Sequence, residues 1–255
     1  MDWIYSLGNF KLAALLVFGG ITLSTVLPAL VRRRLKFEPF KVTSGVEEAF
    51  KVLVSVSLLL IVFSLVRVQG DHRNAEDLAA REAALIFKLN RALVGFGSAQ
   101  AVELQSDLKA YAQSVVQDEW PLLVKGERAP HTSELLADLT QGIRLLDPKN
   151  AVQQIARAEV LGSLTQLSDV REARIAASHL SIPAYLWNTI VCAVLALTLV
   201  GALLSPAEKM VTWVGGVTVA LGLLISLLLS LQYVYRGESR VSAEPIALTV
   251  SLLGP

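Results

Sequence analysis

Four strongly apolar segments, with one long polar segment between the second and the third, constrain this chain more than any other feature. The apolar segments are residues 10–31, 46–68, 184–204 and 210–235. Each is long enough to cross the roughly 30 Å hydrocarbon core of a bilayer as a helix. The polar segment runs from about Val68 to Ile182 and is rich in residues that form helices. We therefore expect membrane helices on both sides of a water-facing helical domain.

The composition agrees with this division. The 255 residues are 53% hydrophobic and 18% charged, and the mean hydropathy is +0.54. Such a chain is too apolar for an ordinary soluble domain and too charged to lie wholly in lipid. The formal net charge of +1 argues against a nucleic-acid partner, because nucleic-acid-binding proteins usually carry a clustered basic excess. The expected partner is the lipid bilayer.

The sequence carries no motif that indicates an enzyme. It has no G-x-S-x-G, no glycine-rich phosphate loop and no H-E-x-x-H. His72, His131 and His179 stand alone, without the spacing of zinc ligands. The single cysteine, Cys192, excludes an intrachain disulfide and a multi-cysteine metal site. We expect no catalysis, no metal and no cofactor.

The fold class that follows is an all-α membrane protein with four transmembrane helices. We expect these helices to form two antiparallel pairs, with a helical extramembrane domain of about four helices inserted between the pairs. The predicted parts are a first transmembrane pair (1–68), the helical domain (69–182), a second transmembrane pair (183–235) and a polar C-terminal tail (236–255).

Helix boundaries within the inserted domain follow from local signals. The two glycines in residues 95–97 are expected to end its first helix. The second helix of the domain is expected to close at residues 118–121, because the residue before a proline is disfavoured in the helical conformation. Thr132 or Ser133 can cap the third helix. Asp147 and Pro148 supply an N-cap and a first-turn residue for the fourth helix.

Two charged residues interrupt apolar stripes on the helices that leave and re-enter the membrane. Glu82 lies about 14 residues beyond Val68 and Arg171 about 12 before Pro183, so both are roughly 20 Å from the membrane at 1.5 Å per residue. A charge that faces a core is costly unless it is paired. We predict an ion pair between Glu82 and Arg171, with Arg174 continuing the same row. In the alternative, both charges extend to solvent at the edge of a helix interface.

Two sets of polar or small residues lie within the apolar segments. One shares a face of the second membrane helix and is the candidate pore face: Ser57, Ile61 and Ser64. The other set lies four residues apart along the fourth membrane helix: Thr218, Gly222, Ser226 and Ser230. Small residues at this spacing let membrane helices approach closely, so we predict a packing edge, with a role in conduction as the alternative.

The charge pattern suggests an orientation. Residues 32–41 contain a dense basic cluster, which predicts a loop on the cytoplasmic side. The helical domain and the C-terminal tail are then expected on the outer, periplasmic face of a bacterial plasma membrane.

A set of motifs extends along nearly the whole chain. Residues 236–245 contain a glycine, a Val-Ser pair and a Glu-Pro pair. The other residues of the set are Glu82, Ala83, Tyr111, Glu119, Trp120, Pro121, Arg171, Arg174, Pro183, Leu186 and Trp187. In this combination the chain resembles the bacterial bestrophin-like domain family of four-helix membrane proteins. One departure is Tyr235, where many members have an aromatic residue preceded by proline.

The resemblance implies a function through the bestrophins, which are pentameric anion channels whose second membrane helix lines the pore. The expectation is therefore a homo-oligomeric channel for a small ion, with Ser57, Ile61 and Ser64 facing the pore. Bestrophins keep their helical domain in the cytosol, whereas the charge pattern here favours the opposite face. The alternative is a membrane-anchored interaction or sensor module without transport activity.

Overall fold

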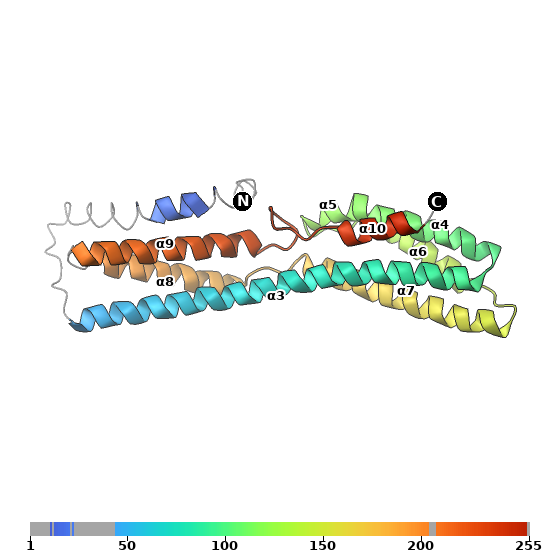
Figure 1. Cartoon of the computed structure of the whole chain (residues 1–255), viewed down its shortest axis with the longest axis horizontal. Coiled ribbons are helices and arrows are strands. Elements are labelled where there is room, and N and C mark those ends of the chain that lie inside the picture. The colour runs from blue at the N-terminus through green and yellow to red at the C-terminus, as the bar shows by residue number, and fades with distance from the viewer. Residues whose placement is uncertain (1–10, 12, 21, 23–43, 204–207, 254–255) are drawn as a thin grey trace. The chain divides into compact units, whose positions relative to one another are not determined.

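The described part of the chain consists of helices joined by turns and loops. The computed structural model describes residues 11, 13–20, 22, 44–203 and 208–253 (Figure 1). These residues form helices and turns and no strand, which confirms the all-helical prediction. The helices are α3 (Ser44–Phe96), α4 (Ala99–Ser114), the π-helix η1 (Val115–Glu119), α5 (Trp120–Leu123), α6 (Pro130–Arg144), α7 (Ala151–Ala177), α8 (Ala184–Leu203), α9 (Glu208–Leu231) and α10 (Glu244–Leu252).

The chain divides into two compact units. The apolar unit comprises Met1–Gly70 and Ser181–Ser239, and the polar unit comprises Asp71–Leu180 and Arg240–Pro255. Helix α3 is continuous and contributes its first part to the apolar unit and its later part to the polar unit. The expected C-terminal tail, residues 236–255, is thus divided between the two units. The part that begins at Arg240, which contains α10, belongs to the polar unit.

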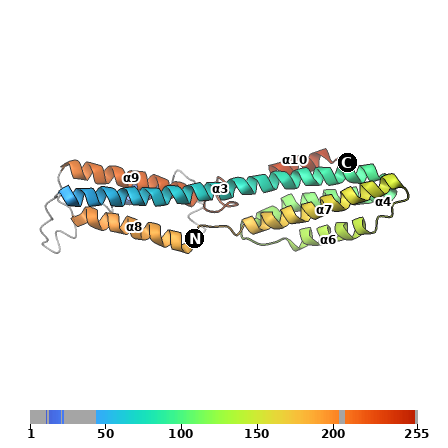
Figure 2. The ribbon, with the colours of Figure 1, turned by 90° about the horizontal axis from the view of Figure 1, so that it is seen from below.

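The apolar unit is a bundle in which α8 and α9 lie along the first part of α3 (Figure 2). Its core is formed by large apolar side chains, among them Phe50, Ile61 and Leu228. The indole of Trp187 donates a hydrogen bond to the Gln232 Oε1 atom at 3.0 Å and so joins α8 to the end of α9.

Two helices in the described part are long and apolar enough to cross a membrane by length and composition. They are Glu47–Phe96, which is most of α3, and Val214–Leu231, which is most of α9. Ala184–Thr198 of α8 is a shorter apolar helix. The predicted first membrane helix, residues 10–31, lies largely outside the described residues, and those described between 11 and 22 are helical.

The polar unit has its own apolar core, built from the later part of α3 with α4, α6 and α7. The core side chains include Ile86, Leu108 and Leu139, all fully buried. Helix α10 closes this core because Ile246 is fully buried in it. The indole of Trp120 also donates a hydrogen bond to the Val241 carbonyl at 3.2 Å, just before α10 begins.

The predicted helix break after α3 is confirmed. The helix ends at Phe96, and Gly97 adopts a positive φ of 66° that suits glycine. Ser98 then caps α4, because its side chain accepts a hydrogen bond from the backbone N–H of Ala101.

Three of the predicted boundaries are wrong. The helix does not close at residues 118–121, because α4 continues through η1 into α5 and Trp120 keeps helical dihedral angles. Pro121 is tolerated because it lies in the first turn of α5. Helix α6 begins at Pro130 with Ala129 as its N-cap, so neither Thr132 nor Ser133 caps it. The N-cap of α7 is Asn150, whose side chain accepts from the Gln153 N–H at 2.8 Å, and not Asp147.

Candidate functional site

Four charged side chains meet in the interior of the polar unit. Glu82 comes from α3, Glu119 from η1, and Arg171 and Arg174 from α7. Glu82, Glu119 and Arg174 are 0% exposed and Arg171 is 3% exposed. Removing charges from water costs several kcal/mol per ion unless they are paired and hydrogen-bonded. The two carboxylates and two guanidiniums balance in charge, and we call this group the buried quartet.

Hydrogen bonds connect the buried quartet in an alternating row. Arg174 donates from Nε and Nη2 to the carboxylate of Glu82 and from Nη2 to the carboxylate of Glu119. Arg171 donates from Nε to the two Glu119 oxygens at 3.1 and 3.3 Å, and from Nη2 to the same carboxylate. The Nη2 atom of Arg171 also donates to the Ser133 hydroxyl at 2.9 Å. The row therefore reads Glu82, Arg174, Glu119, Arg171.

This pairing corrects the predicted partner of Glu82. Glu82 pairs with Arg174, one turn along α7 from Arg171, and Arg171 pairs with Glu119. The predicted heights counted a helical rise of 1.5 Å for every residue between Arg171 and Pro183. In the structure α7 ends at Ala177, and the chain from 178 to 183 is not helical. A count of residues from Pro183 therefore does not give the position of Arg171 along the helix axis. The alternative in which both charges extend to solvent is also excluded by their burial.

Helical spacing explains why α7 contributes two arginines. Arg171 and Arg174 are three residues apart and share one face of the helix. They continue a buried row on α7 that also contains Leu164 and Leu167. An arginine can replace a leucine in such a row only where acceptors are provided, and Glu82 and Glu119 provide them.

The π-helix η1 places Glu119 in the interior. Its wider hydrogen-bonding pattern adds a residue to the turn, so Val115 and Glu119 are both buried on one side. The Ser114 hydroxyl lies 2.7 Å from the Asp118 carboxylate and 2.7 Å from the Thr132 hydroxyl, which ties the segment to α6. Single π-turns within α-helices often occur at functional sites.

Two aromatic side chains complete the surroundings of the buried quartet. The Tyr111 hydroxyl donates to the Glu82 Oε1 atom at 3.0 Å. The guanidinium of Arg174 lies over the ring of Trp120, 5.0 Å from its centroid. That contact accommodates the Nη1 atom of Arg174, which is buried without a hydrogen-bond partner, because an aromatic face attracts a cation.

The electrostatics of the site follow from burial and pairing. Burial acts to lower the pKa of the Arg174 guanidinium, but the attraction of Glu82 and Glu119 outweighs it and raises that pKa above its ordinary value. Burial raises the pKa of the Tyr111 phenol well above its ordinary value, and the charge of Glu82 acts in the same direction. Tyr111 is therefore a permanent donor and Arg174 a permanent cation at physiological pH.

The hydrogen bonds of the buried quartet connect helices of the polar unit. Both oxygens of Glu82 and both oxygens of Glu119 accept at least one hydrogen bond. Carboxylates whose oxygens all accept hydrogen bonds from neighbouring helices hold those helices in register. Within the described residues, no group of three or more His, Cys, Asp and Glu side chains is arranged to hold a metal ion.

A surface ion pair between α7 and the loop before α6 contrasts with the buried quartet. Arg128 donates to both oxygens of Glu172 at 2.6 and 2.7 Å, and both side chains are more than half exposed. The hydrogen bond from Arg128 lowers the pKa of the Glu172 carboxyl. Glu172 is adjacent to Arg171 in the chain, so it serves as a natural control for the buried pairs.

The structure places the predicted pore face inside the apolar unit. Ser57, Ile61 and Ser64 are each 1% exposed. The Ser57 and Ser64 hydroxyls donate to the carbonyls of Leu53 and Leu60, at 2.7 and 2.9 Å, within the same helix. A face that packs against helices of its own chain is not available to line a pore between chains. The exposed apolar side chains of α3, among them Leu59 and Phe63, lie on another side of the helix.

The predicted packing edge consists of Thr218, Gly222, Ser226 and Ser230. A Cβ atom on Gly222 would lie 3.3 Å from the Cα atom of Val17, and a Cβ atom on Gly20 would lie 2.9 Å from the Thr218 methyl group. Ser226 and Ser230 are buried, and the Ser230 hydroxyl donates to the Ser226 carbonyl at 2.7 Å. These close approaches favour packing over conduction for this edge.

No local pattern indicated that Glu119 pairs with an arginine, and neither Tyr111 nor Ser133 was predicted as a site residue. Glu119 lies 52 and 55 positions from the two arginines, and no periodic pattern links such distant residues. The available signal was the resemblance of Tyr111 and of the Glu119-Trp120-Pro121 motif to the family pattern. Glu119 belongs to the buried quartet, and Tyr111 and Trp120 contact its members Glu82 and Arg174. Pro121 is the second residue of α5.

Comparisons with known proteins extend over nearly the whole chain. A model of the Bestrophin-like domain family matches residues 14–246. A search of curated proteins finds no match. The crystal structure of a membrane protein is similar with a TM-score of 0.72 and 13% sequence identity, covering 94% of this chain and 96% of that chain. The crystal structure of a bacterial bestrophin homolog from Klebsiella pneumoniae is similar with a TM-score of 0.69 and 13% identity, covering 94% and 95%.

Proposed function

We propose that this chain, which belongs to the bestrophin-like family, assembles into an oligomeric ion channel of a bacterial plasma membrane. Family membership and the fold it shares with a bacterial bestrophin homolog support a membrane protein of this kind. We further propose which residues line the pore, how copies of the chain assemble around it and which kind of ion passes.

An uncovered apolar stripe on α3 carries the proposal. The stripe consists of Val52, Val56, Leu59, Phe63 and Val66, which are spaced alternately by four and three residues. All five are exposed, and Leu59 and Phe63 are 70% and 65% exposed. Alternation by four and three is the seam by which helices pack around a common axis. We infer that copies of α3 surround the pore through this stripe.

The stripe has the chemistry of a gate. An apolar constriction in a channel closes it by excluding water, and it opens when the ring of side chains widens. The exposed Arg67 follows Val66 directly, at the end of the stripe. A ring of arginines beside the constriction would favour anions over cations. We therefore propose an anion as the conducted ion, and we replace the serine face by this stripe as the pore lining.

Ion flux in proteoliposomes that contain the purified protein tests the proposal. We expect anion flux with the wild-type protein. Phe63→Ser should raise this flux several-fold, because a hydroxyl lets water wet the constriction. Leu195→Ser is the matched control, because Leu195 is an exposed apolar residue of α8 outside the stripe. Absence of flux for several anions and cations would overturn the proposal.

We also propose that the polar unit lies on the periplasmic face, from the basic cluster at residues 32–41. Reporter fusions at Lys125 and Pro39 test this orientation. Activity of a periplasmic reporter at Lys125 and of a cytoplasmic reporter at Pro39 is the expected result, and the reverse pattern would reject it.

The second candidate function is a membrane-anchored interaction module. The independent core of the polar unit favours it, because such a unit can fold and bind a partner without a pore. A monomeric protein without ion flux would support this candidate instead of the channel.

A further inference from the structure

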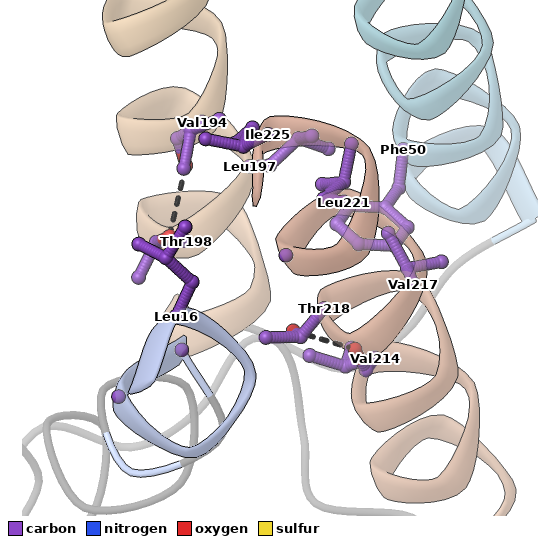
Figure 3. Close-up of a pocket in the computed structure, with 13 residues that line it drawn as sticks. Leu16, Phe50, Val194, Leu197, Thr198, Val214, Val217, Thr218, Leu221 and Ile225 are labelled. Carbon is purple, nitrogen blue, oxygen red and sulfur yellow. Dashed lines mark hydrogen bonds between the residues drawn. The ribbon is translucent and has the colours of Figure 1, made fainter. Parts of the chain in front are cut away.

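A cavity of about 230 Å³ lies within the apolar unit, between α3, α8, α9 and the helix formed by residues 13–20 (Figure 3). Each of these four segments contributes side chains to it, including Leu16, Phe50, Leu197 and Leu221. The cavity is separate from the buried quartet and from the proposed pore stripe, because none of its lining residues belongs to either group.

The wall of the cavity consists almost entirely of apolar groups. Among the described residues that line it, only Thr198 and Thr218 have a side-chain polar atom. Each hydroxyl donates at 2.8 Å to a carbonyl of its own helix, Thr198 to Val194 and Thr218 to Val214, as the dashed lines in Figure 3 show. Because both hydroxyls already donate within their own helices, they have no free donor for a polar ligand. A buried water needs two to four polar partners, and this wall does not supply them.

Glycines shape the cavity. A Cβ atom on Gly222 would meet Val17, and a Cβ atom on Gly20 would meet Thr218. The helix of residues 13–20 and α9 therefore touch at these two points. Gly19 also lines the cavity, but a Cβ atom there would meet nothing within 4 Å. Gly19 is exposed, so the cavity reaches the surface of the unit beside it.

The volume is sufficient for a hydrocarbon. An apolar cavity of roughly 150 Å³ in another protein stays dry and binds benzene, so a space of this size that is lined with apolar groups accepts hydrocarbon and not water. The present cavity is larger, at about 230 Å³. In a membrane protein, the molecules that surround such an opening are lipids, whose acyl chains are as apolar as the wall.

We propose that this cavity binds an acyl chain of a bilayer lipid, which enters beside Gly19 and packs between α8 and α9. The chain fills space that the helices leave empty and so bridges the helix of residues 13–20 to the rest of the apolar unit. This inference is independent of ion conduction, because it concerns only the packing within one copy of the chain.

Photo-crosslinking tests the proposal. The full-length protein is reconstituted in vesicles of phosphatidylglycerol and phosphatidylethanolamine that contain a phospholipid with a diazirine in one acyl chain. After illumination, labelled peptides are mapped by mass spectrometry. We expect labelling at Thr198 and Leu221 in the cavity and also at Val191 and Leu195, which are exposed on α8 and serve as an internal reference for general lipid contact.

A pair of glycine variants makes the test specific. Gly19→Leu should lower the labelling of Thr198 and Leu221, relative to the reference residues, by about tenfold, because the leucine occupies the opening of the cavity. Gly216→Leu is the matched control, since Gly216 of α9 is exposed, has open space for a Cβ atom and does not line the cavity. Thermal unfolding of both variants checks that they fold.

Each outcome decides the proposal. Labelling at the cavity in the wild-type protein that Gly19→Leu removes and Gly216→Leu keeps would support it. Labelling at the reference residues alone would overturn it, and so would equal labelling in the two variants. Labelling of the cavity by a free diazirine-bearing alkane but not by the phospholipid would also overturn it, because the ligand would then be a small apolar molecule. If Gly19→Leu does not fold, the wild-type pattern alone decides.

Discussion

The guanidinium of Arg174 donates hydrogen bonds to the carboxylate of Glu82, which lies 92 positions earlier in the chain. This contact joins the later part of α3 to α7 within the polar unit. Because Arg174 also donates to Glu119, the same side chain ties both helices to η1. Three helical segments of the polar unit therefore depend on one guanidinium.

Removing the charge of Glu82 should destabilise the protein strongly. Glu82→Gln leaves the fully buried Arg174 with one carboxylate, and breaking a buried pair costs about 3–5 kcal/mol. The free energy of unfolding, from denaturant titration in detergent, measures this loss. Glu172→Gln is the matched control, because it breaks the exposed pair of this α7 residue with Arg128 and should cost at most about 1 kcal/mol. Equal losses for the two variants would contradict the prediction.

Glu119 and Arg171 should be energetically coupled. A double-mutant cycle with Glu119→Gln and Arg171→Gln measures the coupling as the departure of the double variant from the sum of the single variants. We expect a coupling energy of about 1–3 kcal/mol, because each change leaves the other residue buried and without its main partner. A double variant that equals the sum of the two single variants would show that the pair is not a unit.

Tyr111→Phe should lower stability at neutral pH by about 2 kcal/mol, because Glu82 loses a buried donor. The hydroxyl also gives stability a pH dependence. Since the folded protein raises the pKa of Tyr111, the stabilisation is fully present below the pKa of the unfolded phenol, which is about 10, and decreases as the pH rises above it.

Unfolding free energies measured across the alkaline range test this dependence. The fall in stability above about pH 10 should be shallower in Tyr111→Phe than in the wild-type protein. Tyr185→Phe, which removes the hydroxyl of an exposed tyrosine, controls for the loss of a hydroxyl in general. Parallel curves for the wild type and Tyr111→Phe would reject the role of this proton.

The proposed arrangement of α3 around a pore predicts cross-links between copies. Cysteines form a disulfide only when their Cα atoms lie within about 7 Å. In a Cys192→Ser background, Phe63→Cys should therefore give covalent oligomers on oxidation, seen on a denaturing gel. Ile61→Cys is the matched control because Ile61 is buried two residues away on the same helix. Cross-linking at Ile61 and not at Phe63 would place the serine face, and not the apolar stripe, between copies.

Some parts of the fold could be predicted because they depend on residues close together in the chain. The break at Gly97 follows from a positive φ that glycine adopts easily, and the buried row of α7 follows from helical spacing. Other local signals were misleading. Pro121 was expected to end a helix, but its place in a first turn and the preceding π-turn accommodate it.

The sequence by itself determined that long apolar helices flank a polar helical domain, because length and hydrophobicity alone decide what can cross a membrane. It also indicated that Glu82, Arg171 and Arg174 face a core. Only the tertiary structure decided that Glu82 pairs with Arg174, that Glu119 completes the quartet, and that Ser57 and Ser64 face inward. The physical reason is axial register. A shift of one turn, about 5.4 Å, exchanges one ion-pair partner for another while every local pattern stays the same.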